Sequence, residues 1–381
     1  MTVGTETPSR PKTTPRPTLR AARLEDYPQI QQLESSHGLL TLEERDWRAM
    51  WVDNPLRPRL GKNFPIGWVL EDPDRRIVGS LANIPTLYTY QGRDLIAVTG
   101  RAWVVSSDYR FMALMLTYKY FNQGGVDLLI NTTVNSMAVD PFSAFGSDRV
   151  PLGDWESAGY RITSYRGFAA AALRMKSAPL PRLLAYPAGL ALRMKDALTL
   201  EALPPGADSV TVEQAREFDS RFDDFWHELV RQNPNKLLGV RNSQTLRWHF
   251  ATPMRQGQAW IFTASRNGLL RAYCILKRQD HPQSGLVRMR MVDHQTLEPD
   301  ADLLSAMLHP ALALCIAERI HVLEHVGMGL PKMRVFDRHA PYRRKLPAWP
   351  FYYHATDPTL HEELRNPQVW DPSTFDGDAS V

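Results

Sequence analysis

The alternation of apolar and polar positions from Arg101 to Gly146 predicts a strand, a helix, a second strand and a second helix. The short apolar run Ala102–Val105 is typical of a central strand. From Tyr109 to Phe121 apolar residues recur at three- and four-residue steps and leave little polar surface, so we expect a helix that is covered on both sides. Gly124-Gly125 end this helix before the apolar run Val126–Ile130. A strand, a crossover helix and a strand of this size form a parallel pair.

The turn between the first strand and the helix is a candidate anion site. The first N–H groups of a helix have no helical partner, and the helix dipole places roughly half a positive charge at that end. The residues Ser106–Ala113 would bring several of these N–H groups together. Phosphate oxygens are favoured ligands for such a turn.

The elements before this stretch complete one α/β (α+β) domain. The pattern predicts a first strand, two helices and then three strands with polar turns between them. The expected ranges are Thr18–Ala22, a helix after Glu25-Asp26, a helix opened by Thr41-x-x-Glu44, and strands Ile66–Leu70, Ile77–Tyr90 and Leu95–Val105. We therefore expect a mixed, mostly antiparallel sheet that contains one splayed parallel pair.

The second half of the chain repeats this layout. The pattern predicts helices at Glu213–Gln232 and Arg241–Phe250, strands at Ala259–Ala264, Leu269–Leu276 and Val287–Val292, a helix at Ala301–Glu318 and a strand at Ile320–Val326. Glu298, Asp300 and Asp302 flank the start of the long helix, where they would cap it and repel a phosphate. We infer that the second half holds no phosphate-bearing cofactor at this position.

Domain boundaries follow from the linkers. We expect a disordered tail at 1–16, a first domain at 17–173, a connector at 174–207, a second domain at 208–356 and a surface tail at 357–381. The connector contains a basic amphipathic segment, Arg182–Lys195, which fits either a helix packed on both domains or a helix on a membrane surface.

Composition and charge narrow the class of protein. At 381 residues the chain suits two domains, and 43% hydrophobic with 23% charged residues is typical of globular proteins. The net charge of +4 does not argue for nucleic acid, and no apolar run reaches the roughly 20 residues of a membrane span. The start of the chain lacks the apolar region of a signal peptide. Cys274 and Cys315 fall in predicted core elements, which indicates reduced thiols and a cytoplasmic location.

Two motifs resemble the GNAT acyltransferase superfamily over residues 17–172. Val104-x-Ser106-x-Asp108-Tyr109-Arg110 is similar to the strand end and loop that hold the pyrophosphate of acetyl-CoA in that family. Asn135-x-x-Ala138-x-x-x-Phe142-x-x-x-Gly146 is similar to its fourth helix. Two positions depart from the pattern: Met112–Met115 replaces the glycines of the loop, and Phe142 replaces a tyrosine that often protonates the leaving thiolate. A loop without glycines lets the pyrophosphate approach less closely.

The narrower similarity is to long bacterial GNAT-like proteins with two such domains. It rests on the loop without glycines together with Asn131–Thr133, Arg149–Pro151 and Tyr165–Phe168.

The resemblance implies a set of cofactor-binding residues and an acceptor cleft. The implied cofactor-binding residues are Trp103, Val104, Val105, Tyr109, Arg110, Phe111, Met112, Ala113, Asn135 and Phe142. Asn131 and Thr132 are candidates for the cleft, because open α/β sheets bind ligands at the carboxyl ends of central strands, and they fit hydrogen bonding to the splayed backbone equally well. Asn135 fits a pantetheine contact or a helix cap equally well. No catalytic base stands out, since Asp108, Asp154 and Glu156 also fit loop and capping roles.

The implied activity is transfer of an acyl group from acetyl-CoA or another acyl-CoA to an amine of a small molecule or an amino sugar, by direct attack in a cleft between the halves. The alternatives are an enzyme that uses an acyl carrier protein or an aminoacyl donor, and a catalytically silent binding module. We expect a monomer or homodimer with no metal, since His321 and His325 on one strand would lie about 13 Å apart.

Overall fold

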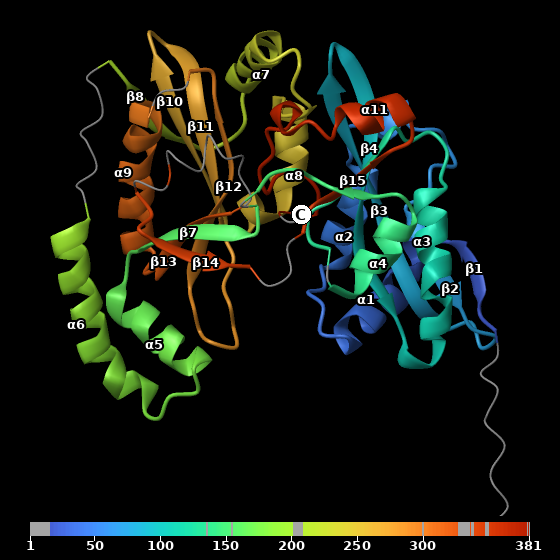
Figure 1. The fold of residues 1–381 in the computed structure, drawn as a ribbon, viewed down its shortest axis with the longest axis horizontal. Helices are drawn as coiled ribbons and strands as arrows, with labels where there is room; N and C mark the ends of the chain where they lie inside the picture. The colour runs from blue at the N-terminus through green and yellow to red at the C-terminus, as the bar shows by residue number, and fades with distance from the viewer. Residues whose placement is uncertain are drawn as a thin grey trace, which may run out of the picture. The chain divides into compact units, whose positions relative to one another are not determined.

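The computed structural model describes residues 16–134, 136–153, 155–200, 209–298, 301–326, 336, 339–346, 350–378 and 380 (Figure 1). The chain divides into two compact units. The first comprises Met1–Arg48, Lys62–Ile84 and Gly100–Gln123, and the second comprises Ala49–Gly61, Pro85–Thr99 and Gly124–Val381.

The first sheet has the strand order β1-β2-β3-β4-β5-β15-β6, with β9 paired to β3. Its strands are β1 Thr18–Ala21, β2 Gly67–Glu71, β3 Ile77–Tyr90, β4 Arg93–Val105, β5 Leu128–Asn131, β6 Asp148–Arg149, β9 Leu238–Gly239 and β15 Tyr352–Ala355. The sheet is mostly antiparallel, and its parallel pair is β4 with β5.

The second sheet has the order β14-β7-β13-β12-β11-β10-β8. Its strands are β7 Ser157–Ile162, β8 Thr211–Ala215, β10 Ala259–Arg266, β11 Leu269–Arg278, β12 Arg288–Thr296, β13 Val322–Val326 and β14 Tyr342–Lys345. Only β12 and β13 pair in parallel among its described ladders. The predicted fold class, two mixed sheets that each contain a parallel pair, is confirmed.

Helices cover both sheets. The α-helices are α1 Tyr27–Ser36, α2 Glu44–Val52, α3 Ala113–Phe121, α4 Ser136–Ala144, α5 Tyr165–Met175, α6 Pro181–Thr199, α7 Arg221–Gln232, α8 Ser243–Arg255, α9 Ala301–Ala317 and α11 Pro358–Glu363. Short 3₁₀ helices are η1 Leu24–Asp26, η2 Arg57–Arg59, η3 Ser107–Met112 and η4 Pro367–Val369. The long helix α9 packs its apolar side, including the buried Cys315, against β10 and β11, where Cys274 is buried as well.

Strand pairing crosses the predicted domain boundaries, which themselves stay a prediction. We expected residues from Tyr160 to Leu173 to complete the first domain, yet β7 lies in the second sheet between β13 and β14. Conversely β15, from the end of the predicted second domain, lies in the first sheet between β5 and β6. Alternation along one strand predicts which face is buried but not which neighbour completes the ladder.

Two expectations about local structure and burial are wrong. The range Glu213–Gln232 is not one helix, because Thr211–Ala215 forms an edge strand on β10 and α7 begins only at Arg221. The residues after Trp370 do not form a surface tail, because the side chains from Ser373 to Asp376 are buried. The acidic, Gly- and Ser-containing composition hid this, since it is the composition of a solvated segment.

Candidate functional site

The junction between β4 and α3, in the first unit, has an uncapped helix start. After Val105 the chain enters η3, and the first intrahelical bond joins the Tyr109 N–H to the Ser106 carbonyl at 2.9 Å. No side chain caps η3 or the start of α3. The N–H groups of Ser107 and Asp108 precede that first bond and so have no helical acceptor. This geometry fits the predicted anion site, although binding of a phosphate stays a prediction.

The eight predicted cofactor residues of this junction lie together on β4, η3 and the first turn of α3. Val104, Tyr109 and Met112 are buried and form its base, whereas Arg110 and Phe111 are exposed. The Arg110 side chain has no hydrogen bond or ion pair within the described part of the chain. It is therefore available to an anionic ligand.

The helix after this junction is not covered on both sides, which corrects the expectation from its apolar pattern. Phe111, Leu114 and Tyr118 are exposed by 63%, 54% and 54%. They follow one another at steps of three and four residues and so share one face of η3 and α3. A sequence that is apolar all round cannot show which of its faces stays open.

Strand β4 contains a backbone feature that the sequence did not reveal. Ala102 has φ +53°, in the left-handed region that side chains rarely adopt. For an alanine this conformation costs roughly 1–2 kcal/mol, and such strain tends to collect at functional sites. It lies one residue before the predicted cofactor residues Trp103–Val105.

The parallel pair of the first sheet, β4 with β5, is short. It consists of Ala97 opposite Leu128 and Val98 opposite Leu129. The carboxylate of Asp127 accepts the N–H of Ile96 at 2.8 Å and fixes the register at the start of the pair. On its other side β5 continues along β15 up to Asn131, which lies opposite Tyr352.

A carboxylate that sequence reasoning missed lies at the carboxyl end of β5. One oxygen of Asp378 accepts the Thr132 hydroxyl at 2.9 Å and the Thr132 N–H at 3.3 Å, and the other accepts the Thr133 hydroxyl. The residue before it, Gly377, has φ +82°, and a Cβ there would lie 2.6 Å from the Thr132 hydroxyl oxygen. Only glycine fits this approach without strain. The cleft candidates Asn131 and Thr132 are both buried. Thr132 donates hydrogen bonds to Asp378.

A buried ion cluster anchors this terminal segment. Arg241 donates to Asp293 at 3.0 Å and to Asp376 at 2.8 Å, and all three side chains are at most 2% exposed. Tyr88 donates its hydroxyl to the second oxygen of Asp376, and Tyr273 donates to Asp293, each at 3.0 Å. Burial raises the pKa of Asp376 above its ordinary value, and the Arg241 charge opposes that rise.

A cavity of about 160 Å³ lies beside this segment, within the second unit. Its lining includes Asn54, Tyr88, Trp248, His249 and Gly377. The walls combine aromatic faces with a few polar side chains, as is usual for small-molecule sites. Gly377 belongs to this wall and touches Thr132, so the cavity adjoins the end of β5.

His249 is a titratable group of the cavity wall. Burial, followed by the nearby Lys277 charge, lowers the pKa of His249 to about 3. Its Nε2 lies 2.7 Å from the Ser380 hydroxyl. The imidazole is therefore neutral at physiological pH.

Solved structures with a similar fold cover most of the chain. A GCN5-related N-acetyltransferase from Anabaena variabilis matches with a TM-score of 0.51 at 11% identity, over 90% of this chain and 73% of that one. N-myristoyltransferase of Saccharomyces cerevisiae with bound myristoyl-CoA matches with a TM-score of 0.55 at 9% identity, over 92% and 81%. A probable N-acyltransferase from Enterococcus faecalis gives 0.54 at 10%, over 89% and 72%.

These matches extend over both sheets, each with its parallel pair. The chain has a tandem GNAT fold. No protein-family model matches the sequence, and no curated protein sequence matches it. The fold expected from the two motifs is confirmed, while the residues that act within this GNAT fold stay predictions.

The cofactor contacts predicted for the fourth-helix motif stay a prediction. Phe142 is buried in α4, with its ring centroid 6.5 Å from that of Tyr352 on β15. The Tyr352 hydroxyl has no protein hydrogen-bond partner among the described residues. Tyr352 of strand β15 therefore lies beside Phe142 of helix α4. Asn135 falls outside the described residues.

The other titratable candidates have structural partners in this GNAT fold. Glu156 pairs with Arg149, and Asp154 lies outside the described residues. His325 is buried against the ring of Phe336, and burial lowers its pKa to about 4. The Nδ1 of His321 accepts the Val287 N–H at 3.2 Å.

Within the described ranges, no three His, Cys, Asp or Glu side chains are arranged to hold a metal ion. In the same ranges no helix has both the length and the apolar character that crossing a bilayer requires.

Proposed function

We propose that this chain is an acyltransferase that moves an acyl group from acyl-CoA to the amine of a small molecule. The similar GNAT-fold structures include N-acetyltransferases and an N-myristoyltransferase with bound myristoyl-CoA. On the donor side, the uncapped N–H groups of Ser107 and Asp108 support binding of the pyrophosphate. The exposed Arg110 guanidinium supplies a positive charge and paired donors for phosphate oxygens.

The observation that carries the acceptor side is the carboxylate of Asp378, which Thr132 and Thr133 hold and which directly follows Gly377 in the wall of a cavity. A fixed carboxylate attracts an ammonium group and accepts hydrogen bonds from it. The Thr132 and Thr133 donors hold the carboxylate in place. A cavity of about 160 Å³ suits an acceptor of a few heavy atoms rather than a protein segment.

The proposed reaction is a direct displacement. The acceptor binds to Asp378 as an ammonium ion and loses one proton to solvent, so that its nitrogen has a free electron pair while Asp378 accepts a hydrogen bond from it. The nitrogen attacks the thioester carbonyl carbon, and a carbon–nitrogen bond forms while the carbon–sulfur bond breaks. The CoA thiolate leaves and takes a proton from the Tyr352 hydroxyl, in place of the tyrosine that Phe142 replaces. As the amide forms, the nitrogen loses its second proton to solvent, and Tyr352 regains its own proton from solvent.

The main competing function is a GNAT-fold binding module without catalysis. Phe142 favours it, because phenylalanine cannot donate a proton, and so does the absence of glycine in the η3 loop. Thermal unfolding separates a CoA-binding protein from one that ignores CoA, since a ligand that binds only the folded state raises the melting temperature. We expect a saturable rise with acetyl-CoA or a longer acyl-CoA. No rise with any acyl-CoA would refute the donor site.

Release of free CoA thiol, measured against amino acids, amino sugars and polyamines, tests catalysis and identifies the acceptor. With an active acceptor, Tyr352→Phe is expected to lower kcat by about 10²–10⁴-fold, the usual contribution of a general acid. The matched control Tyr186→Phe, on the exposed side of α6, should leave kcat unchanged.

For the donor, Arg110→Ala should weaken acyl-CoA binding, whereas Lys119→Ala in the last turn of α3 should not. Saturable acyl-CoA binding without thiol release for any acceptor would favour the binding module.

A further inference from the structure

Helix α6 presents an apolar face to solvent. Seven large apolar side chains of α6 and its N-cap residue are exposed by 43% or more. They are Leu180 at the N-cap, Leu183, Leu184, Tyr186, Leu190, Met194 and Leu198. At about 100° per residue, Leu183, Leu190 and Met194 fall within one narrow stripe, and Leu184 and Leu198 widen it on one side. Isolated exposed apolar residues are ordinary, but a contiguous stripe along a whole helix indicates an interaction surface.

The opposite face of α6 packs on the protein. Ala185, Gly189 and Asp196 are buried there, and Gly189 lets the helix approach α5 so closely that a Cβ would lie 3.0 Å from the Arg166 nitrogen. Asp196, the one acidic residue of α6, accepts hydrogen bonds from the hydroxyls of Tyr165 and Tyr342. The docking of α6 is thus complete without the apolar stripe, and its negative charge is turned inward.

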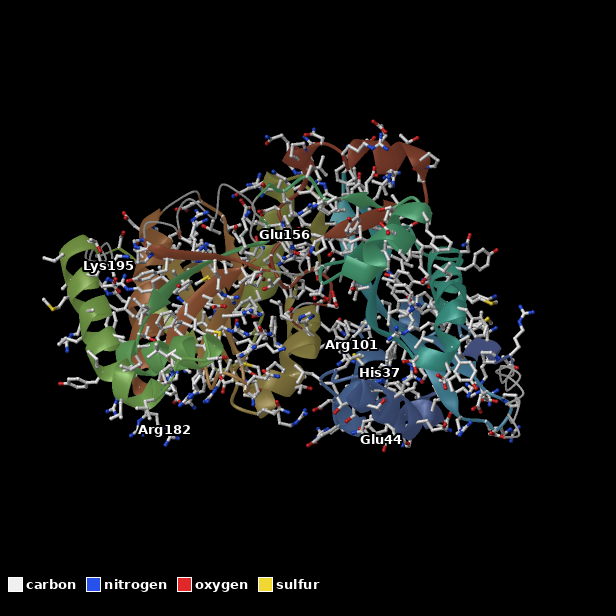
Figure 2. All side chains as sticks on the ribbon, turned by 60° about the horizontal axis from the view of Figure 1, so that its bottom comes forward. His37, Glu44, Arg101, Glu156, Arg182 and Lys195 are labelled. Carbon is white, nitrogen blue, oxygen red and sulfur yellow. The ribbon has the colours of Figure 1, made fainter. Side chains whose placement is uncertain are left out.

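The charges that remain exposed on α6 are positive and flank the stripe. On the helical wheel Arg182 and Arg193 lie along one edge of the stripe and Lys195 lies along the other. Along the helix axis, Arg182 and Lys195 lie near opposite ends of α6 (Figure 2). Lys195 also lies 4.9 Å from the Tyr342 ring centroid. An apolar stripe edged by cations is complementary to a surface that is apolar inside and anionic outside.

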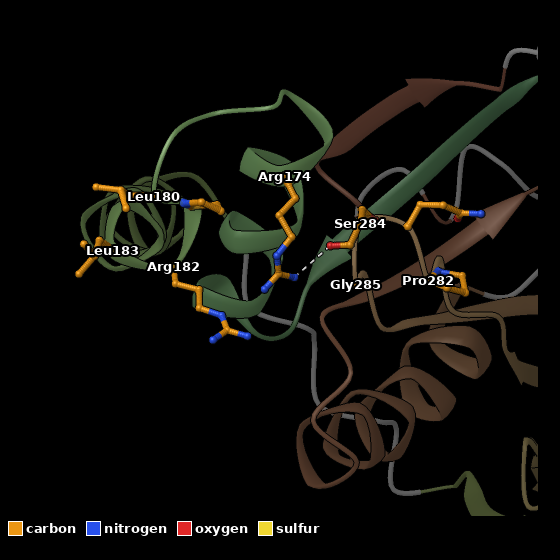
Figure 3. A pocket seen from close by; sticks show the side chains of 9 residues that line it. Arg174, Leu180, Arg182, Leu183, Pro282, Ser284 and Gly285 are labelled. Carbon is orange, nitrogen blue, oxygen red and sulfur yellow. Dashed lines mark hydrogen bonds between the residues drawn. The ribbon is translucent and has the colours of Figure 1, made fainter.

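A basic depression adjoins the start of the stripe. A groove of about 610 Å³ is lined by Arg174, Arg182, Leu180 and Leu183 on one side and by the loop Pro282–Gly285 on the other. In Figure 3 Leu180 and Leu183 point away from α5, whereas Arg174 reaches from α5 toward Ser284, whose carbonyl it contacts at 3.1 Å. Two guanidinium groups beside an apolar edge suit a phosphate headgroup above acyl chains.

We propose that α6 binds the surface of a membrane that contains anionic lipids, with the stripe in the acyl region and Arg182 and Arg193 at the headgroup phosphates. The helix has 19 residues, about 28 Å of length at 1.5 Å per residue, and lies flat in the interface rather than crossing it. Charge complementarity favours this partner over a second copy of the chain, because two copies of the same face would bring Arg182 and Arg193 against like charges. The proposal is independent of the acyltransferase activity.

Co-sedimentation with vesicles tests the proposal on the full chain. One set of vesicles contains equal parts of phosphatidylcholine and phosphatidylglycerol, and the other contains phosphatidylcholine alone. We expect binding to the anionic vesicles that weakens with added salt, and at least tenfold weaker binding for Leu190→Glu/Met194→Glu. Arg182→Gln/Arg193→Gln should lose the preference for anionic vesicles.

The matched control is Leu269→Glu/Ile316→Glu, two side chains elsewhere that are exposed by 59% and 64%, close to the 51% and 60% of Leu190 and Met194. It should bind vesicles as the wild type does. An unchanged melting temperature shows that each variant is folded. Equal binding of the stripe variant and the wild type, or no binding of the wild type to anionic vesicles, overturns the proposal. A wild-type dimer that the stripe variant dissociates, without vesicle binding, overturns it as well and assigns the face to self-association.

Discussion

Replacement of Arg241 by methionine should make the stability of the second unit strongly pH-dependent. The Arg241 guanidinium donates to Asp293, Asp376, the Gly239 carbonyl and the Ser373 hydroxyl, and it is 1% exposed. Methionine fills a similar volume and can still pack on the ring of Phe375, which the guanidinium now covers at 4.5 Å. What the variant lacks is the charge that two buried carboxylates share.

The cost has a ceiling that follows from protonation. A buried carboxylate without its cation can take up a proton, and at pH 7 this costs about 4 kcal/mol for an aspartate with an ordinary pKa near 3.9. Loss of one buried ion-pair partner typically costs about 3–5 kcal/mol, in agreement with that figure. We therefore expect Arg241→Met to lose about 4–8 kcal/mol at pH 7, depending on whether one or both of Asp293 and Asp376 must be neutralised.

Lowering the pH removes much of this cost. In the variant the folded-state pKa of each unpaired carboxylate is raised. The resulting loss of folding free energy is fully present at a pH above that pKa, and it decreases as the pH falls toward the pKa of the unfolded state. From pH 7 to pH 5 the difference between wild type and variant should shrink by about 2.7 kcal/mol per carboxylate, at 1.36 kcal/mol per pH unit. Urea unfolding of both proteins at pH 7, 6 and 5 measures this difference directly.

The double variant Arg241→Met/Asp376→Asn is the matched test of the mechanism. It leaves only Asp293 without its cation, so it should be more stable than Arg241→Met at pH 7 and should show about half of the pH dependence. A deficit of equal size at pH 7 and pH 5, or no recovery in the double variant, would show that packing rather than charge carries the effect of Arg241.

Three smaller predictions concern backbone and titration. Gly377→Ala should lower the free energy of unfolding by at least about 1 kcal/mol, because φ +82° and the 2.6 Å approach to Thr132 both oppose a Cβ, and it should reduce acyl transfer; an unchanged variant in both assays contradicts the site. In β4, Ala102→Val should destabilise more than Ala102→Gly in the same urea assay, since a β-branched residue at φ +53° is strained and glycine is not; equal stability would contradict the strain. The pKa of His249 is lowered to about 3, so its contribution to stability is present above pH 6.5 and is lost as the pH falls from 6.5 toward 3, at about 1.4 kcal/mol per pH unit. His249→Gln should flatten that part of the plot of urea stability against pH. An equal slope in both proteins would show that His249 does not cause it.

The sequence predicted best where structure depends on local patterns. The strand, helix and strand around Tyr109 follow from apolar periodicity and from the glycines at 124 and 125, and they form as β4, η3 with α3, and β5. The first turn became a 3₁₀ helix, and one helix face stayed open, because neither depends on the period of the apolar residues. The strained Ala102 had no sequence signal, since alanine rather than glycine occupies the position.

Prediction failed where distant segments complete a ladder or a charge cluster. Strands β7 and β15 each pair with two strands, and most of these neighbours lie far along the chain. The small and acidic residues of the terminal segment predict that it is exposed to solvent. Its burial depends on Arg241, which precedes Asp376 by 135 residues, and no local pattern reports a pairing over that distance.

The two aspartates of the terminal segment have different roles for a physical reason. Asp376 is buried with a guanidinium and has every oxygen occupied, so it can only anchor the chain. Asp378 follows two residues later, a distance of about 7 Å at most, and it is half-buried next to Gly377, which lines the cavity. Because Gly377 joins them in a conformation that only glycine adopts without strain, the position of Asp378 at Thr132 depends on the anchor at Arg241. A change at Arg241 should therefore reduce acyl transfer even at a pH where the protein stays folded. If Arg241 affected only stability, acyl transfer at that pH would be unchanged.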